Sequence, residues 1–107
     1  MFFALRATSR YDVERNAQAV LFSGAHQFPG RVVEKFDGGV RLALSGMGSR
    51  RLRSVITVGA PVDLLIKSDL KVYQCRIRHF DGDTVNLSFV DRASRARTRE
   101  LLSRLTA

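Results

Sequence analysis

The sequence contains one cysteine, no tryptophan and no long run of apolar residues. A single cysteine cannot form an intramolecular disulfide, and it is too few for a zinc site. No apolar stretch approaches the roughly 20 residues that a membrane-spanning helix needs. The start, Met1 to Leu5, is too short for the apolar segment of a secretory signal peptide. We therefore expect no membrane insertion and a cytoplasmic location.

Patterns that carry catalysis are also missing. The two histidines, His26 and His79, lie in a predicted turn and beside a predicted hairpin, and neither neighbours a nucleophile motif. The ten acidic residues are scattered, with no pair at metal-ligand spacing on one predicted element. Gly46-x-Gly48 lacks the lysine of a phosphate-binding P-loop. The sequence thus indicates a protein that is not an enzyme and that holds no metal or other cofactor.

Arginine is abundant. Of the 18 basic residues, 3 are lysine and 15 are arginine, against 10 acidic residues, which gives a net charge of +8. The planar guanidinium group suits bidentate contacts with phosphate or carboxylate and stacking on flat rings. The excess therefore suggests an anionic partner, which could be a nucleotide, a nucleic acid or an acidic protein surface. The alternative is that many of these side chains are simply solvated.

Alternating apolar residues predict six short antiparallel strands. They are expected at residues 15–23, 31–36, 40–44, 62–66, 72–77 and 85–89, with a further short strand or extended edge at 55–58. Cys75 alternates with apolar neighbours and is predicted to be a buried strand residue. Residues 45–54 are rich in glycine and arginine and are interpreted as a loop.

Two tight hairpins are predicted. Asp37-Gly38 is typical of a two-residue type I′ turn, which needs a positive φ at both central residues. This turn would place Glu34 opposite Arg41, and Val33 opposite Leu42. The second hairpin, at residues 81–83, is expected to have a three-residue loop.

The tail changes from a strand pattern to a helix pattern. Thr98, Leu101, Leu102 and Leu105 fall at i, i+3, i+4 and i+7, which predicts an amphipathic helix over 92–106. Asp91 or Ser94 could cap its start. Its other face carries Arg95, Arg97, Arg99 and Arg104.

These elements together predict a mainly β fold. Small sheets protect their edges by closing into a barrel, and a helix can cover an open end. We expect a small six-stranded antiparallel β-barrel with a C-terminal α-helix. The 107 residues would form one domain, with an N-terminal arm at 1–14, the barrel at 15–90 and the helix at 92–106.

Two motifs give the chain a resemblance to the PilZ domain family, bacterial β-barrel modules of which many bind the second messenger cyclic di-GMP. Arg6 and Arg10 match the family's first motif, Arg-x-x-x-Arg. The second motif, Asp/Asn-x-Ser-x-x-Gly, aligns with Glu34, Phe36 and Gly39, of which only the glycine is kept. The resemblance covers most of the chain, and it implies a non-catalytic second-messenger effector that binds cyclic di-GMP and an effector protein.

The resemblance also implies roles for these residues. Arg6 and Arg10 would grip phosphates and stack on guanine, and Gly39 would allow close backbone approach. Glu34 keeps a carboxylate for guanine N–H groups, one methylene longer. Phe36 removes a hydroxyl, and its ring either obstructs the pocket or stacks on a base.

Two alternatives remain at the level of the sequence, and the first rests on structural explanations of the same residues. Glu34 could pair with Arg41 across the hairpin, Phe36 could be a barrel residue, and Arg6 and Arg10 could be a disordered basic start. Together these describe a degenerate PilZ-like adaptor that binds protein and not nucleotide. The second alternative is a nucleic-acid-binding small barrel.

Overall fold

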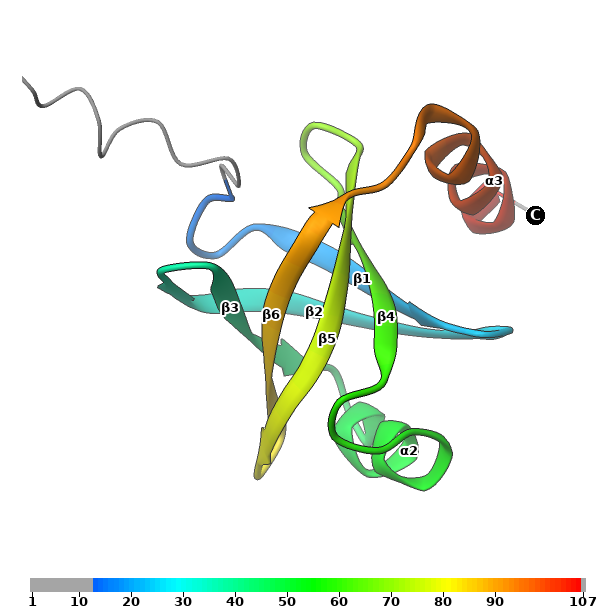
Figure 1. Ribbon diagram of the computed structural model, residues 1–107. Coiled ribbons are helices and arrows are strands. Elements are labelled where there is room, and N and C mark those ends of the chain that lie inside the picture. The colour runs from blue at the N-terminus through cyan, green and yellow to red at the C-terminus, as the bar shows by residue number, and fades with distance from the viewer. Residues whose placement is uncertain (1–12, 107) are drawn as a thin grey trace, which may run out of the picture.

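The computed structural model describes residues 13–106, and these form a closed barrel of six antiparallel strands with two helices outside it (Figure 1). The order around the barrel is β1-β2-β3-β6-β5-β4. The strands are β1 (Gln18–Ser23), β2 (His26–Phe36), β3 (Gly39–Leu44), β4 (Pro61–Ile66), β5 (Lys71–Asp81) and β6 (Thr84–Arg92). The helices are α2 (Gly48–Val55) and α3 (Arg95–Thr106). The predicted fold class is therefore confirmed.

The main hydrophobic core fills the barrel. Because side chains alternate along a strand, one set from each strand points inward; this set includes Leu21, Leu42, Leu64 and Ile77, all with no exposed surface. Cys75 belongs to this core and is 1% exposed, as predicted. Burial raises the pKa of its thiol, and the charge of Asp63 adds to the rise.

The register of the β2–β3 hairpin is partly as predicted. Glu34 lies opposite Arg41 across a turn at Asp37-Gly38. A β-bulge between Val32 and Glu34 places Val32 opposite Leu42, so the expected pairing of Val33 with Leu42 is wrong. The turn is also not type I′. Of its two residues only Gly38 has a positive φ, +84°, a conformation that glycine adopts without steric penalty.

The last hairpin is tighter than expected. Asp81 pairs with Thr84, so the turn contains the two residues Gly82 and Asp83 and not the three-residue loop that was predicted. Ile77 lies opposite Leu87 and Cys75 opposite Phe89, as the alternation of apolar residues indicates.

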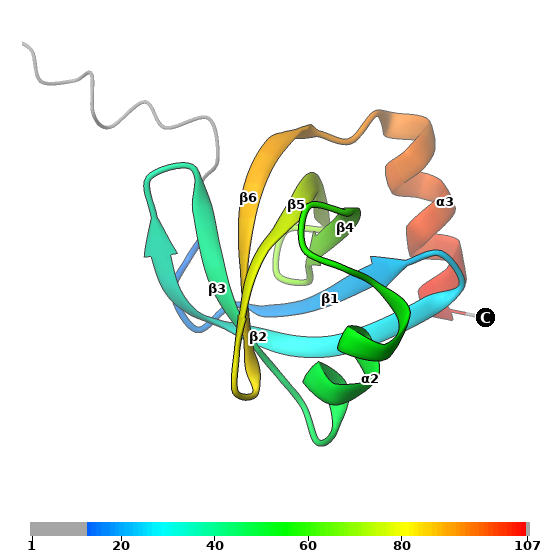
Figure 2. The same cartoon turned by 60° about the horizontal axis from the view of Figure 1, so that its bottom comes forward.

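Helix α2 overturns the interpretation of residues 45–54 as a loop. Its one apolar anchor is Leu52, which is fully buried and belongs to the barrel core. The Ser49 hydroxyl donates a hydrogen bond to the Gly82 carbonyl at 3.0 Å, which ties the helix to the β5–β6 turn. The helix covers one end of the barrel (Figures 1 and 2). The extended segment expected at 55–58 does not form a strand, since the Ile56 amide continues the helical bonding to Leu52.

Helix α3 lies elsewhere than expected. It begins at Arg95, and the Ser94 hydroxyl caps it by accepting a hydrogen bond from the Arg97 amide at 3.1 Å. It packs against the outer wall of the barrel and does not cover an open end. A second core is buried beneath it, formed by Val20, Phe22, Leu65, Val72 and Leu101. Neither helix within residues 13–106 is long and apolar enough to cross a membrane.

Candidate functional site

The β2–β3 hairpin carries three of the predicted site residues onto the outer wall of the barrel. Glu34, Phe36 and Gly39 lie on the two sides of its turn. Arg6 and Arg10 lie outside the described residues. The hairpin therefore brings the aligned second motif together in space, as its sequence spacing requires.

Arg41 connects the side chains on this wall. Its Nη1 lies 3.0 Å from Glu34 Oε1, and its Nε donates a hydrogen bond to Asn86 Oδ1 at 3.0 Å. Its guanidinium carbon lies 5.6 Å from the centroid of the Phe36 ring, within the range of a cation–π contact. The carboxylate of Glu34 is therefore already engaged by a cation across the hairpin, which is the pairing that the sequence offered as an alternative.

Close packing against β6 requires glycine at position 39. Gly39 pairs with Ser88 where β3 meets β6. A Cβ atom here would overlap the carbonyl oxygen of Leu87 and lie 3.3 Å from its carbonyl carbon. The backbone that approaches Gly39 closely is thus that of β6, whereas the family resemblance assigns this close approach to a ligand.

A shallow hollow of about 410 Å³ lies beside the hairpin turn. Its walls include Phe36, Gly38, Gly39, Arg78, Asn86 and Ser88. The Phe36 side chain is 40% exposed. The residue thus lines the hollow and stays partly exposed although the Arg41 guanidinium lies over its ring.

Sequence reasoning missed Arg78. Register shifts between Ile77 and His79 on β5, so that Arg78 is the extra residue of a β-bulge. Bulges redirect side chains and are frequent beside functional sites. Arg78 is exposed and lines the hollow, and its side chain makes no ion pair or hydrogen bond with any residue from 13 to 105. Only the alternation of Arg76 and Arg78 along the strand could have indicated an outward-facing arginine.

Ser88 was also missed. It lies opposite Gly39 on the neighbouring strand and lines the same hollow. It supplies a hydroxyl beside Phe36, at whose position the family motif has serine. The site thus combines an exposed aromatic ring, a guanidinium, an amide and a hydroxyl with the carboxylate of Asp37. Such groups can stack on a base, bind a phosphate and hydrogen-bond to the edge of a purine.

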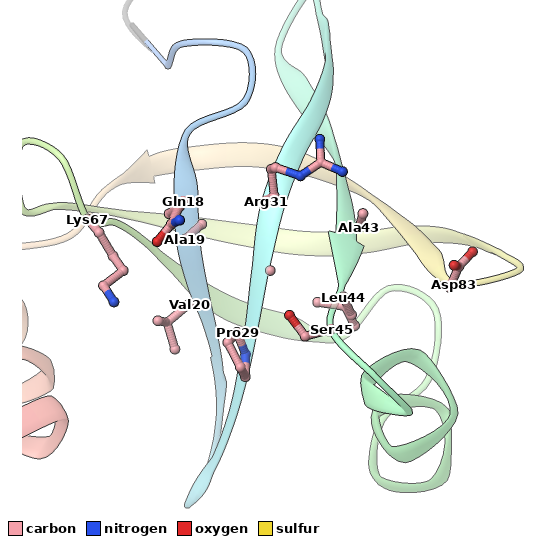
Figure 3. Close-up of a pocket in the computed structure, with 11 residues that line it drawn as sticks. Gln18, Ala19, Val20, Pro29, Arg31, Ala43, Leu44, Ser45, Lys67 and Asp83 are labelled. Carbon is pink, nitrogen blue, oxygen red and sulfur yellow. The ribbon is translucent and has the colours of Figure 1, made fainter.

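A second hollow, of about 450 Å³, lies on the wall formed by β1, β2 and the end of β3. Arg31, Lys67 and Asp83 reach its rim, but they stand apart from one another in Figure 3. Arg31 also donates a hydrogen bond to the Asn16 side chain at 3.2 Å. Without converging charges, this hollow is the weaker candidate for an anionic ligand.

No group of three or more histidine, cysteine, aspartate or glutamate side chains in the described part of the chain could hold a metal ion. The sequence matches no protein-family model, and the search of curated proteins gives no match either.

Proposed function

We propose that this chain is a non-catalytic PilZ-like domain, and that it binds cyclic di-GMP in the hollow beside the β2–β3 hairpin to act as a bacterial second-messenger effector. One observation carries the proposal: Phe36 and Gly39 of the aligned second motif line one hollow on the outer wall together with Arg78 of β5, which has no side-chain partner among residues 13–105.

Each group at the hollow has a role in this proposal. The exposed face of Phe36 stacks on a guanine ring, a contact that contributes about 1–3 kcal/mol per base. Arg78 binds a phosphate, with a charge-assisted hydrogen bond that contributes about 1.5–3 kcal/mol. Ser88 offers a hydroxyl to the edge of the base. Arg6 and Arg10 grip the phosphates, as the family resemblance implies.

The second candidate function is that of a protein adaptor that no longer binds the nucleotide. The ion pair between Glu34 and Arg41 favours it, because a carboxylate held by arginine is less available to guanine N–H groups. In this alternative the hairpin wall keeps the family's fold and contacts an effector protein directly.

Calorimetric titration with cyclic di-GMP separates the two. We expect saturable, stoichiometric binding that Arg6→Ala or Arg10→Ala abolishes and that Arg78→Ala weakens about tenfold or more, since 1.4 kcal/mol corresponds to a factor of ten. Arg50→Ala is the matched control, because Arg50 is exposed on α2 at the end of the barrel. It should leave the affinity unchanged.

Absence of heat at high ligand concentration would favour the adaptor. Equal weakening by Arg78→Ala and Arg50→Ala would instead show that only net charge attracts the nucleotide. A steep fall of affinity for duplex DNA with salt, tighter than any dinucleotide binding, would point to the nucleic-acid interpretation.

A further inference from the structure

The arginines of α3 and of the end of β6 fall into two groups, and the first group holds the helix to the barrel. Arg97 Nη2 lies 2.7 Å from Asp63 Oδ2 on β4, and its Nη1 lies 3.0 Å from Glu100 Oε1. Arg104 donates a hydrogen bond to the Gly24 carbonyl at 2.6 Å and lies over the Phe22 ring, 5.3 Å from its centroid. These two side chains are explained by the packing of α3.

The second group has no such explanation. It consists of Arg92, Arg95 and Arg99, called here the α3 cluster, and all three residues are exposed. None of their side chains makes a hydrogen bond or an ion pair with any residue between 13 and 105. Two carboxylates are near this cluster in sequence: Asp91 accepts a hydrogen bond from the backbone amide of Arg92, and Glu100 is bound by Arg97.

The three arginines line one hollow. Arg95 and Arg99 are four residues apart, which puts them on the same face of the helix. Together with Arg92, at the end of β6, they line a hollow of about 300 Å³. Ala93, Thr98 and Leu102 form the rest of its surface. Thr98 is half-buried there, so the hollow also contains a hydroxyl.

This arrangement is unfavourable without a partner. Like charges at i and i+4 repel each other on a helix surface. Arg95 also lies in the first turn of α3, which contains no acidic residue, and a cation at this end opposes the helix dipole. An anion between the three guanidinium groups would relieve both effects.

We propose that the α3 cluster is an anion site for a small ligand carrying a diphosphate or triphosphate group. Guanidinium forks bind phosphate oxygens in a bidentate manner, and the Thr98 hydroxyl donates a further hydrogen bond. The volume of the hollow is at the lower end for small-molecule pockets. Arg97 and Arg104 are turned to the protein, so α3 offers no continuous basic stripe for a nucleic-acid backbone.

The site is separate from the proposed cyclic di-GMP site and does not rest on it. The β2–β3 hairpin and α3 lie on different sides of the barrel in both views (Figures 1 and 2). The phosphate chain could belong to inorganic polyphosphate or to a nucleoside triphosphate, whose base and sugar would contact Leu102.

The test is an NMR titration of the full chain with sodium tripolyphosphate, and separately with ATP and GTP, at about physiological ionic strength, where surface charges are screened beyond roughly 8 Å. We expect saturable shifts of the amides from 92 to 102, and at least tenfold weaker binding in Arg95→Ala/Arg99→Ala. The control is Arg15→Ala/Arg50→Ala, which removes the same charge from exposed positions elsewhere. It should change the affinity less than twofold. Tighter binding of ATP or GTP than of tripolyphosphate identifies a nucleotide, and equal binding identifies the phosphate chain alone.

Thermal unfolding checks that the helix variant is folded. Its melting temperature should equal or exceed that of the wild type, because Arg97 and Arg104 remain; a fall of several degrees would show a structural role and overturn the proposal. Absence of saturable shifts, or equal weakening by the control, would also overturn it. The proposal would also be overturned if duplex DNA bound to the same arginines more tightly than tripolyphosphate. Displacement of tripolyphosphate from the cluster by cyclic di-GMP would overturn it as well.

Discussion

Substitution of Gly39 by alanine tests the packing of the hairpin against β6. The added Cβ overlaps the Leu87 carbonyl oxygen and lies 3.4 Å from the Ser88 Cα. Both are backbone atoms, so no change of rotamer relieves the overlap and β6 itself must move. That movement is resisted because the Leu87 side chain is 2% exposed inside the barrel, and because the Phe89 amide is bonded to the Gly38 carbonyl at 2.7 Å.

Overpacking of this kind destabilises by about 1–3 kcal/mol. In a closed barrel the strand has no free edge along which to shift, so we expect the upper part of this range. Since about 1 kcal/mol lowers the melting temperature of a small domain by roughly 4–8 °C, Gly39→Ala should melt about 10–20 °C below the wild type.

The matched control is Gly38→Asn at the neighbouring position. Gly38 has a φ of +84°, with open space where a Cβ would lie, and asparagine tolerates this left-handed region. Its melting temperature should fall by only a few degrees. Thermal and urea unfolding followed by circular dichroism measure both variants. If Gly39→Ala melts within about 3 °C of the wild type, taken against the 4–8 °C expected per kcal/mol, the close contact with β6 does not explain this glycine.

Three further outcomes are expected. Leu101→Ala should lower the free energy of unfolding by about 2–5 kcal/mol, because it leaves a cavity in the core under α3. The control Leu70→Ala, at a 52% exposed turn position, should lower it by less than about 1 kcal/mol. Similar losses for the two variants in urea unfolding would contradict the second core. Glu34→Gln should lower the free energy of unfolding by about 0.2–1 kcal/mol, since the ion pair of Glu34 with Arg41 is partly exposed, and this loss should decrease with added salt. A larger loss that does not depend on salt would argue against a surface ion pair. Cys75, whose burial raises the pKa of its thiol, should react with a thiol reagent at pH 8 only after unfolding; rapid labelling of the native chain would disprove its burial.

Local patterns predicted the barrel and its hairpins because a strand period of two and a tight turn fix register over short distances. The pairing of Glu34 with Arg41 follows from these two facts alone. The bulges at Val33 and Arg78 could not be predicted in this way, because a bulge depends on the partner strand as well as on its own sequence.

The two helices were also predicted only in part from the sequence. Helix α2 (GSRRLRSV) has a single large buried apolar residue, Leu52, so it contains too few apolar residues for a helical period to be recognised. The stripe of α3 predicted the helix but not its location. The run Ala19 to Phe22 is apolar on both faces, which in hindsight indicates a strand covered on its outer side as well.

The sequence predicted only those residues of the candidate site that are close to one another along the chain. Glu34, Phe36 and Gly39 are close in sequence, and one hairpin brings them together. Arg78 and Ser88 come from β5 and β6, and only the closure of the sheet places them beside Phe36. The engagement of Glu34 by Arg41, which favours the adaptor, is visible in both the pattern and the structure.

The most direct test of the proposed function is to map cyclic di-GMP onto the amides of the chain by NMR titration. Binding in the hollow beside the hairpin should give saturable shifts that are largest at Gly38, Gly39 and Ser88, and these should be lost in Phe36→Ala. No saturable shift, or shifts confined to residues away from this wall, would contradict the account.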